Sequence, residues 1–75
     1  MRNYIVTFFS HYDATVFAGF LKGQGIEARL MPTPRKISAS CGTCVSFVSG
    51  EEMDFSGFEI DGVYEKMING FSKLV

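Results

Sequence analysis

The chain has 75 residues, of which 47% are hydrophobic and 15% aromatic, and its formal net charge is −1. This length accommodates one domain, which we place at residues 1–75, and the composition is too apolar for a disordered chain. Seven basic residues against eight acidic ones do not provide the basic excess of a general nucleic-acid or membrane-surface binder, so we expect neither partner.

The first part of the chain predicts a strand and a helix. Residues 4–9, YIVTFF, are β-branched and aromatic, which is typical of a strand buried on at least one face. Ser10 then offers an N-cap oxygen, and Asp13 adds a carboxylate in the first turn, where it complements the helix dipole. Apolar residues follow at helical spacing as far as Gly23, so we predict a helix over residues 11–23.

Two further strands are predicted by alternation of side chains. Residues 26–31, IEARLM, alternate with the period of a half-buried strand. We expect this strand to end before Pro32, because proline cannot donate a ladder hydrogen bond. Residues 43–49, TCVSFVS, alternate again and place Cys44 and Val45 on opposite faces.

The last segment fits either a helix or a hairpin. Several apolar residues have helical spacing, but Asn69-Gly70 is typical of a type I′ turn, in which both central residues have positive φ. We therefore favour a hairpin that pairs residues 60–68 with residues 71–75.

Together these elements predict a small two-layer α+β domain. The order is strand, helix, strand, strand and C-terminal hairpin, which indicates a mixed or antiparallel sheet of four to five strands with one helix on a face. One helix cannot cover such a sheet, so a second copy of the chain could bury aromatic residues of the uncovered face. We expect six phenylalanines in the core or in that interface: Phe8, Phe9, Phe17, Phe20, Phe47 and Phe58.

The connection between the second and third predicted strands has an unusual composition. It reads PTPRKISASCGTC over residues 32–44 and holds both prolines and both cysteines of the chain. Pro32 and Pro34 stiffen its first half, and Gly42 permits positive φ beside Cys41. Long loops in compact domains are usually functional or mobile.

The residues around Cys41 suit a reactive thiol. The thiolate is the nucleophilic form of cysteine, and cations or hydrogen-bond donors stabilise it. Arg35 and Lys36 bring positive charge close in sequence, and Ser38 and Ser40 can donate hydrogen bonds to a sulfur atom. Cys41 is therefore the candidate nucleophile.

Cys44 lies inside a predicted strand and is the candidate resolving or supporting thiol. If Cys41 carried a persulfide, Cys44 could attack it, release sulfide and close a disulfide. His11, at the start of the predicted helix, could approach the loop and assist a thiolate, although a surface position beside the helix cap is the more common arrangement.

Two other interpretations of the cysteines stay open. Cysteine is often a passive, buried small hydrophobe. A structural zinc site needs four ligands, so this chain would need a dimer that supplies four cysteines, or His11 together with a carboxylate. In the leading interpretation we expect no resident metal or cofactor.

We also expect a cytoplasmic protein. No apolar run approaches the roughly 18–20 residues that cross a bilayer. The N-terminal residues lack the longer apolar region and the small-residue cleavage site of a signal peptide. In the cytosol, paired cysteines are more often reactive or metal-binding than joined in a structural disulfide.

The segments FFSHYDA and GIEARLMPTPRKISASCG resemble a bacterial family of domains of unknown function, described as selenium/sulfur (Se/S) carrier protein-like. The resemblance covers residues 4–48 and is carried by Gly25, Ile26, Pro32, Pro34, Arg35, Ile37, Ser38, Ser40, Cys41 and Gly42. It implies a carrier that holds sulfur or selenium on Cys41. Many members have an aliphatic residue at the position of Cys44, and many continue with a second helix, for which EEMDFSG, residues 51–57, is too short.

The leading hypothesis is a non-catalytic carrier, or at most a sulfurtransferase-like protein. It would accept sulfur or selenium from a donor protein as a persulfide or perselenide on Cys41 and pass it to an acceptor protein. The alternative is a non-enzymatic protein-interaction module, dimeric through its aromatic face, in which Cys41 and Cys44 are passive or bind a metal.

Overall fold

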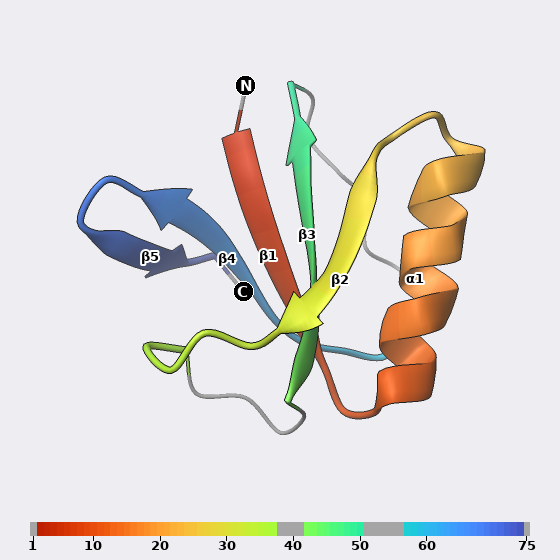
Figure 1. The fold of residues 1–75 in the computed structure, drawn as a ribbon, viewed down its shortest axis with the longest axis horizontal. Helices are drawn as coiled ribbons and strands as arrows, with labels where there is room; N and C mark the ends of the chain where they lie inside the picture. The colour runs from red at the N-terminus through yellow and green to blue at the C-terminus, as the bar shows by residue number, and fades with distance from the viewer. Residues whose placement is uncertain (1, 38–41, 51–56, 75) are drawn as a thin grey trace.

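The computed structural model describes residues 2–37, 42–50 and 57–74. In chain order it contains β1 (Arg2–Phe8), α1 (His11–Gly23), β2 (Ala28–Pro32), β3 (Thr43–Ser49), β4 (Ile60–Met67) and β5 (Gly70–Lys73). The strands form one sheet in the order β2-β3-β1-β4-β5, and α1 packs against one side of it (Figure 1). The predicted α+β class is confirmed, with five strands, and each strand pair of the described residues is antiparallel.

The helix connects two strands that are not neighbours. β3 lies between β1 and β2 and is antiparallel to both, so β1 and β2 run in the same direction. A crossover of this length is what parallel strands require. As a result, β2 is an edge strand, and the chain enters β3 next to the end of β2.

The helix has the predicted limits, His11–Gly23, because both of its ends are capped locally. The hydroxyl of Ser10 accepts a hydrogen bond from the N–H of Asp13 at 3.2 Å, which satisfies a free helix N–H. At the other end, Gly25 has a φ of 78° and donates its N–H to the carbonyl of Lys22 at 3.1 Å. Positive φ suits glycine, and the chain leaves the helix there.

The larger hydrophobic core lies between α1 and the sheet. Phe17 of α1 is completely buried, and its ring lies 5.3 Å from Phe8, 6.0 Å from Phe47 and 4.9 Å from Phe58, measured between centroids. The buried members of this core are Tyr4, Val6, Phe8, Ala14, Phe17, Ala18, Leu21, Ala28, Val45, Phe47 and Val63. Most of the expected aromatic core therefore lies under the helix.

Two of the six phenylalanines are not core residues. Phe9 is 54% exposed and Phe20 is 40% exposed, although the Phe20 ring still contacts Phe17 and Phe58. Phe9 also lies outside β1, which ends at Phe8, one residue before the predicted end of that strand.

A second, smaller cluster lies on the opposite face of the sheet. Ile5, Ile37 and Cys44 are buried there, and Met31, Tyr64 and Phe71 pack around them. Ile37 comes from the connection after β2, so this connection covers a part of the face that α1 leaves uncovered. The alternation predicted for residues 43–49 is confirmed, with Cys44 in this cluster and Val45 in the larger core.

The limits of the second strand differ from the prediction. β2 includes Pro32, which pairs with Thr43, and it begins only at Ala28. Proline is tolerated because β2 is an edge strand, where a missing N–H need not interrupt the ladder. Ile26 is not in the strand because its N–H donates to the carbonyl of Leu21 at 2.9 Å and still belongs to the end of the helix.

The C-terminal hairpin is confirmed, but its predicted turn is wrong. Met67 pairs with Gly70, so the two loop residues are Ile68 and Asn69 rather than Asn69 and Gly70. Neither loop residue has positive φ, so the type I′ turn does not form. Gly70 instead takes a φ of 145° as the first residue of β5.

An ion pair joins β1 to β4 at their exposed ends. Arg2 donates to both carboxylate oxygens of Glu65, at 2.8 and 3.1 Å. These hydrogen bonds raise the pKa of Arg2 and lower the pKa of Glu65.

In the ranges 2–37, 42–50 and 57–74, the structure has no helix with both the length and the apolar character needed to span a membrane.

Substituting Phe17 should remove the centre of the core. We expect Phe17→Ala to lower the free energy of unfolding by about 3–5 kcal/mol, because truncating a buried phenylalanine leaves a cavity. Urea unfolding followed by circular dichroism measures this loss. Phe9→Ala is the matched control and should change stability by no more than about 0.5 kcal/mol. Equal losses in the two variants would contradict the assigned core.

Candidate functional site

The loop that carries the predicted site is closed where β2 meets β3. Pro32 pairs with Thr43 at the last position of the ladder. Immediately beyond this pair, the N–H of Thr33 donates to the carbonyl of Gly42 at 2.8 Å. The connection therefore leaves and re-enters the sheet at one place, beside the end of the edge strand.

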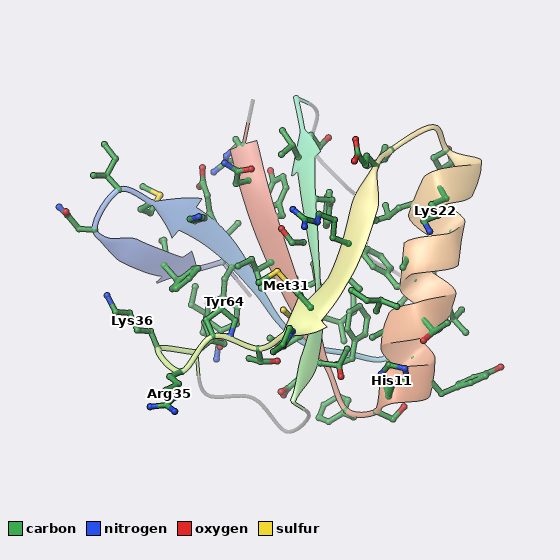
Figure 2. All side chains as sticks on the ribbon, viewed as in Figure 1. His11, Lys22, Met31, Arg35, Lys36 and Tyr64 are labelled. Atoms are coloured by element: carbon green, nitrogen blue, oxygen red, sulfur yellow. The ribbon has the colours of Figure 1, made fainter. Side chains whose placement is uncertain are left out.

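The first half of the loop is a turn that presents two cations. The N–H of Ile37 donates to the carbonyl of Pro34 at 3.0 Å, which places Arg35 and Lys36 at the central positions. Both are exposed, and Figure 2 shows them extending outward from the turn. Ile37 is 6% exposed and packs in one cluster with Cys44. The turn is thus attached to the sheet by its last residue and displays its charges to solvent.

Cys44 is completely buried under this turn. Its Sγ atom donates to the carbonyl oxygen of Pro32 at 3.8 Å. Burial raises the pKa of the Cys44 thiol, and a hydrogen bond with the Thr33 side chain opposes this only in part. A shielded, neutral thiol is a poor nucleophile. The predicted resolving role of Cys44 therefore requires that the cluster around it, which includes Ile5 and Ile37, first opens.

Three predicted site residues lie outside the described residues. They are Ser38, Ser40 and Cys41, so the roles predicted for them remain predictions. Gly42 is described. Glycine permits a positive φ at this position, but Gly42 does not adopt one. A Cβ atom at Gly42 would meet no atom within 4 Å, so the described surroundings do not require glycine there.

The start of α1 lies beside the base of the loop. His11 Nδ1 is 3.3 Å from the hydroxyl oxygen of Thr43, which stands between Gly42 and Cys44 in the sequence. His11 therefore approaches this connection by contacting the hydroxyl of Thr43. Because the N-terminus of a helix carries partial positive charge, the entry to β3 lies next to a favourable place for an anion.

His11 and the loop cations are well separated. In Figure 2, His11 lies at the foot of α1, and Arg35 and Lys36 lie toward the other end of the molecule. His11 therefore lies at the base of the loop, beside Thr43, whereas Arg35 and Lys36 lie in the turn between Pro34 and Ile37.

Within the part of the chain that the structure describes, no group of three or more His, Cys, Asp or Glu side chains is arranged to hold a metal ion. His11 instead contacts the hydroxyl of Thr43. The alternative site built from the cysteines of two chains involves Cys41, which is outside the described residues.

Two contributions to the site were missed by sequence reasoning. One is the covering of Cys44 by Ile37, and the other is the closure of the loop by Thr33 and Gly42. Ile37 is the one branched aliphatic side chain between residues 33 and 40. An isolated apolar side chain in a polar loop is a signal for packing against the nearest sheet, and it could have predicted the cover.

Comparison with protein families gives a match that spans this site. The family model described as "Putative Se/S carrier protein-like" matches residues 3–65. The match includes the complete connection between β2 and β3 and stops before β5. No curated protein and no solved structure gives a significant match to the chain.

The burial of Cys44 predicts slow alkylation. In a Cys41→Ser background, the native protein should react with iodoacetamide much more slowly than the urea-unfolded protein. Ile37→Ala should accelerate the native reaction at least about tenfold, because truncating a buried isoleucine weakens packing by more than the roughly 1.4 kcal/mol that a tenfold change requires. Mass spectrometry against time measures both rates.

Val48→Ala serves as the control for alkylation. Val48 is on the same strand but is 43% exposed, so its truncation should leave the rate unchanged. A native rate equal to the unfolded rate would show that Cys44 is accessible.

The raised pKa of Cys44 predicts a loss of stability in alkaline solution. The unfolded thiol ionises near its ordinary value of 9.0, whereas the folded thiol keeps its proton to higher pH. The protonated Cys44 thiol therefore makes its full contribution to the free energy of unfolding below pH 9.0. That contribution declines as pH rises toward the folded pKa, because the unfolded thiol loses its proton first. In a Cys41→Ser background, urea unfolding on both sides of pH 9.0 should show this decline. Adding Cys44→Ala should make the slope shallower, and an unchanged slope would contradict the assignment.

Proposed function

We propose that this chain, which belongs to the Se/S carrier protein-like family, holds sulfur or selenium on Cys41 as a persulfide or perselenide. The observation that carries the proposal is the family match, because it extends over residues 3–65 and thus over the whole connection that contains Cys41. A carrier role also implies a donor protein that loads the site and an acceptor protein that empties it. The proposal requires no resident cofactor, and reducing conditions such as those of the cytoplasm suit it.

Loading is an exchange between thiols. The Cys41 thiolate attacks the outer sulfur of a donor persulfide, a new S–S bond forms at Cys41, and the donor leaves as a thiolate. Delivery repeats the same exchange, with an acceptor thiolate as the attacking group. A perselenide donor transfers selenium in the same way. No external oxidant or reductant is consumed, because the transferred atom keeps its oxidation state.

The surroundings of the loop base favour a thiolate near Gly42. Cys41 precedes Gly42 in the sequence, and the carbonyl of Gly42 is fixed by the N–H of Thr33 at 2.8 Å. The next residue, Thr43, contacts His11 at the positive end of α1. Ionised thiols are stabilised by helix N-termini and by nearby cations. These features support Cys41 as the residue that reacts.

The remaining loop residues have supporting roles in this proposal. Arg35 and Lys36 raise the local positive potential and attract an acidic partner, while Ser38 and Ser40 donate hydrogen bonds to the loaded atom. Pro32 and Pro34 limit the conformations available to the first half of the loop.

Cys44 has a separate role in the proposal, as the thiol that discharges the carrier. When its thiolate attacks the Sγ atom of a loaded Cys41, a Cys41–Cys44 disulfide forms and hydrosulfide leaves. Because burial keeps Cys44 neutral and covered by Ile37, this reaction is slow. A loaded carrier therefore has time to meet its acceptor.

A protein-interaction module with passive cysteines is the second candidate function. The packing of Cys44 as a small hydrophobic side chain favours it. In that case a variant with both Cys41→Ser and Cys44→Ser would keep its partner, whereas a carrier would lose its activity.

Loading can be tested with small donors. The protein is incubated with glutathione persulfide, or with its selenium analogue, and analysed by intact-mass spectrometry under non-reducing conditions. We expect the mass to increase by one sulfur or one selenium atom, and peptide mapping should locate the added atom on Cys41. Cys41→Ser should not gain mass, because the nucleophile is absent.

Cys44→Ser is the matched cysteine control. It should load normally and release hydrosulfide more slowly than the unmodified chain, because the discharging thiol is missing. Equal loading of the unmodified chain and of Cys41→Ser, or no loading of either, would reject the carrier.

A further inference from the structure

The face of the sheet opposite α1, called here the open face, carries one row of side chains across all five strands. Directly paired residues of antiparallel strands share a face. The pairings place Arg29, Ser46, Ile5, Tyr64 and Lys73 in this row, one from each strand in sheet order. Four strand spacings of roughly 4.8 Å separate Arg29 from Lys73 by about 19 Å. The row thus has a cation at each end and apolar side chains near its middle.

Three further cations belong to the same side of the molecule. Lys66 is two residues beyond Tyr64 on β4 and therefore shares its face. Arg35 and Lys36 are on the turn that packs onto the open face through Ile37. These three residues together with Arg29 and Lys73 are five of the seven basic residues of the chain, and all five are exposed.

The five cations differ from Arg2 in forming no ion pair with the residues that the structure describes. Arg2 is on the α1 face and is paired with Glu65 at 2.8 Å. Within residues 2–37, 42–50 and 57–74, none of the five cations of the open face forms an ion pair. Their charge is therefore available to another molecule, although the net charge of the whole chain is −1.

A shallow depression adjoins one end of the row. Its volume is about 310 Å³, and its lining includes both Arg29 and Glu27, so a carboxylate accompanies the cation at this end of the row. The complete lining is Asn3, Glu27, Arg29, Ser46, Phe47 and Val48.

The centre of the open face favours a protein partner over a nucleic acid. Met31, Tyr64 and Phe71 are partly buried around Ile37 and Cys44. An apolar centre within a charged rim is typical of protein interfaces. Binding of single-stranded nucleic acid relies on aromatic rings that are free to stack with bases, whereas the rings of this face pack into the cluster.

We propose that the open face is the docking surface for an acidic surface on the protein that delivers sulfur or selenium to this chain. The inference rests on the proposed carrier function for the identity of the partner and on the five unpaired cations for its charge. Complementary charges increase the rate of encounter and make it sensitive to salt. The turn that belongs to this surface ends at Ile37, four residues before Cys41 in the sequence.

Binding can be measured without any sulfur chemistry. The Cys41→Ser variant is labelled with ¹⁵N and titrated with an oligoglutamate peptide, which represents an acidic protein surface. We expect chemical shift changes at β4, at β5 and in the Pro34–Ile37 turn, and we expect them to disappear at high salt. Changes confined to α1, or no changes at all, would overturn the proposal.

Charge reversal tests the assigned surface. Lys66→Glu combined with Lys73→Glu should weaken peptide binding about tenfold, because the two changes remove two attractions and replace each with a repulsion. Arg29→Glu tests the opposite end of the row and should also weaken binding. Lys22→Glu is the control matched in charge to Arg29→Glu, since Lys22 is exposed on α1, far from Arg35 and Lys36 in Figure 2. Equal effects of Lys22→Glu and Arg29→Glu would show that only net charge matters and would overturn the proposal.

Two further arms separate the alternatives. Oligouridylate of the same charge is titrated in parallel, and tighter binding of the RNA than of the peptide would overturn the proposal in favour of a nucleic acid. The peptide titration does not depend on Cys41, so failure of the carrier chemistry leaves its result unaffected. If the peptide does not bind while the unmodified chain loads from glutathione persulfide, the docking proposal fails and the carrier function stands.

Discussion

The packing of Ile37 onto Ile5 and Cys44 is the contact on which the site depends. A single helix covers one face of a five-stranded sheet, and the other face would expose apolar side chains if the connection after β2 did not return over it. This return closes the base of the loop at Thr33 and turns Arg35 and Lys36 toward solvent. Stability and function therefore share one segment, because the residues that complete the second cluster also position the loop.

The same contact belongs to the cluster that shields Cys44. Cys44 is held neutral among apolar side chains, where a thiol contributes to packing. Cys41 lies outside the described residues. A carrier benefits from a shielded second thiol, since an adjacent and equally reactive thiol would discharge the loaded atom before an acceptor arrives. The CxxC spacing alone does not reveal that Cys44 is buried.

Local signals predicted the elements whose limits are decided locally. α1 has its predicted ends because Ser10 caps one end and glycine ends the other, and β3 has its predicted ends because its alternation is regular. The limits of β2 and the hairpin turn were predicted wrongly, since they depend on neighbouring strands. Pro32 is acceptable only because β2 is at an edge, and Gly70 serves as a strand residue only because Met67 is its partner.

The composition of the loop predicted Cys41, Arg35 and Lys36 as site residues, and for Cys41 this stays a prediction. The family match over residues 3–65 includes this segment but assigns no role to its residues. The arrangement of the connection could not be predicted from the sequence. The burial of Cys44 was not predictable from the CxxC spacing, because the cluster around Cys44 brings together residues from other strands and from the connection, among them Ile5 and Ile37. The row of charges on the open face could not be predicted without the strand order, which places β2 and β5 at opposite edges of the sheet.

Pro32 at the end of β2 has a consequence for how this chain meets other chains. An edge strand with free amide groups is a template on which further strands can add, which is how sheets grow into aggregates. A proline interrupts that template at one margin of the sheet, and β5, with four residues, offers only a short template at the other. Addition of a strand from another chain is therefore disfavoured at both margins of the sheet, which leaves the side chains of its faces as the surface for contact with other molecules.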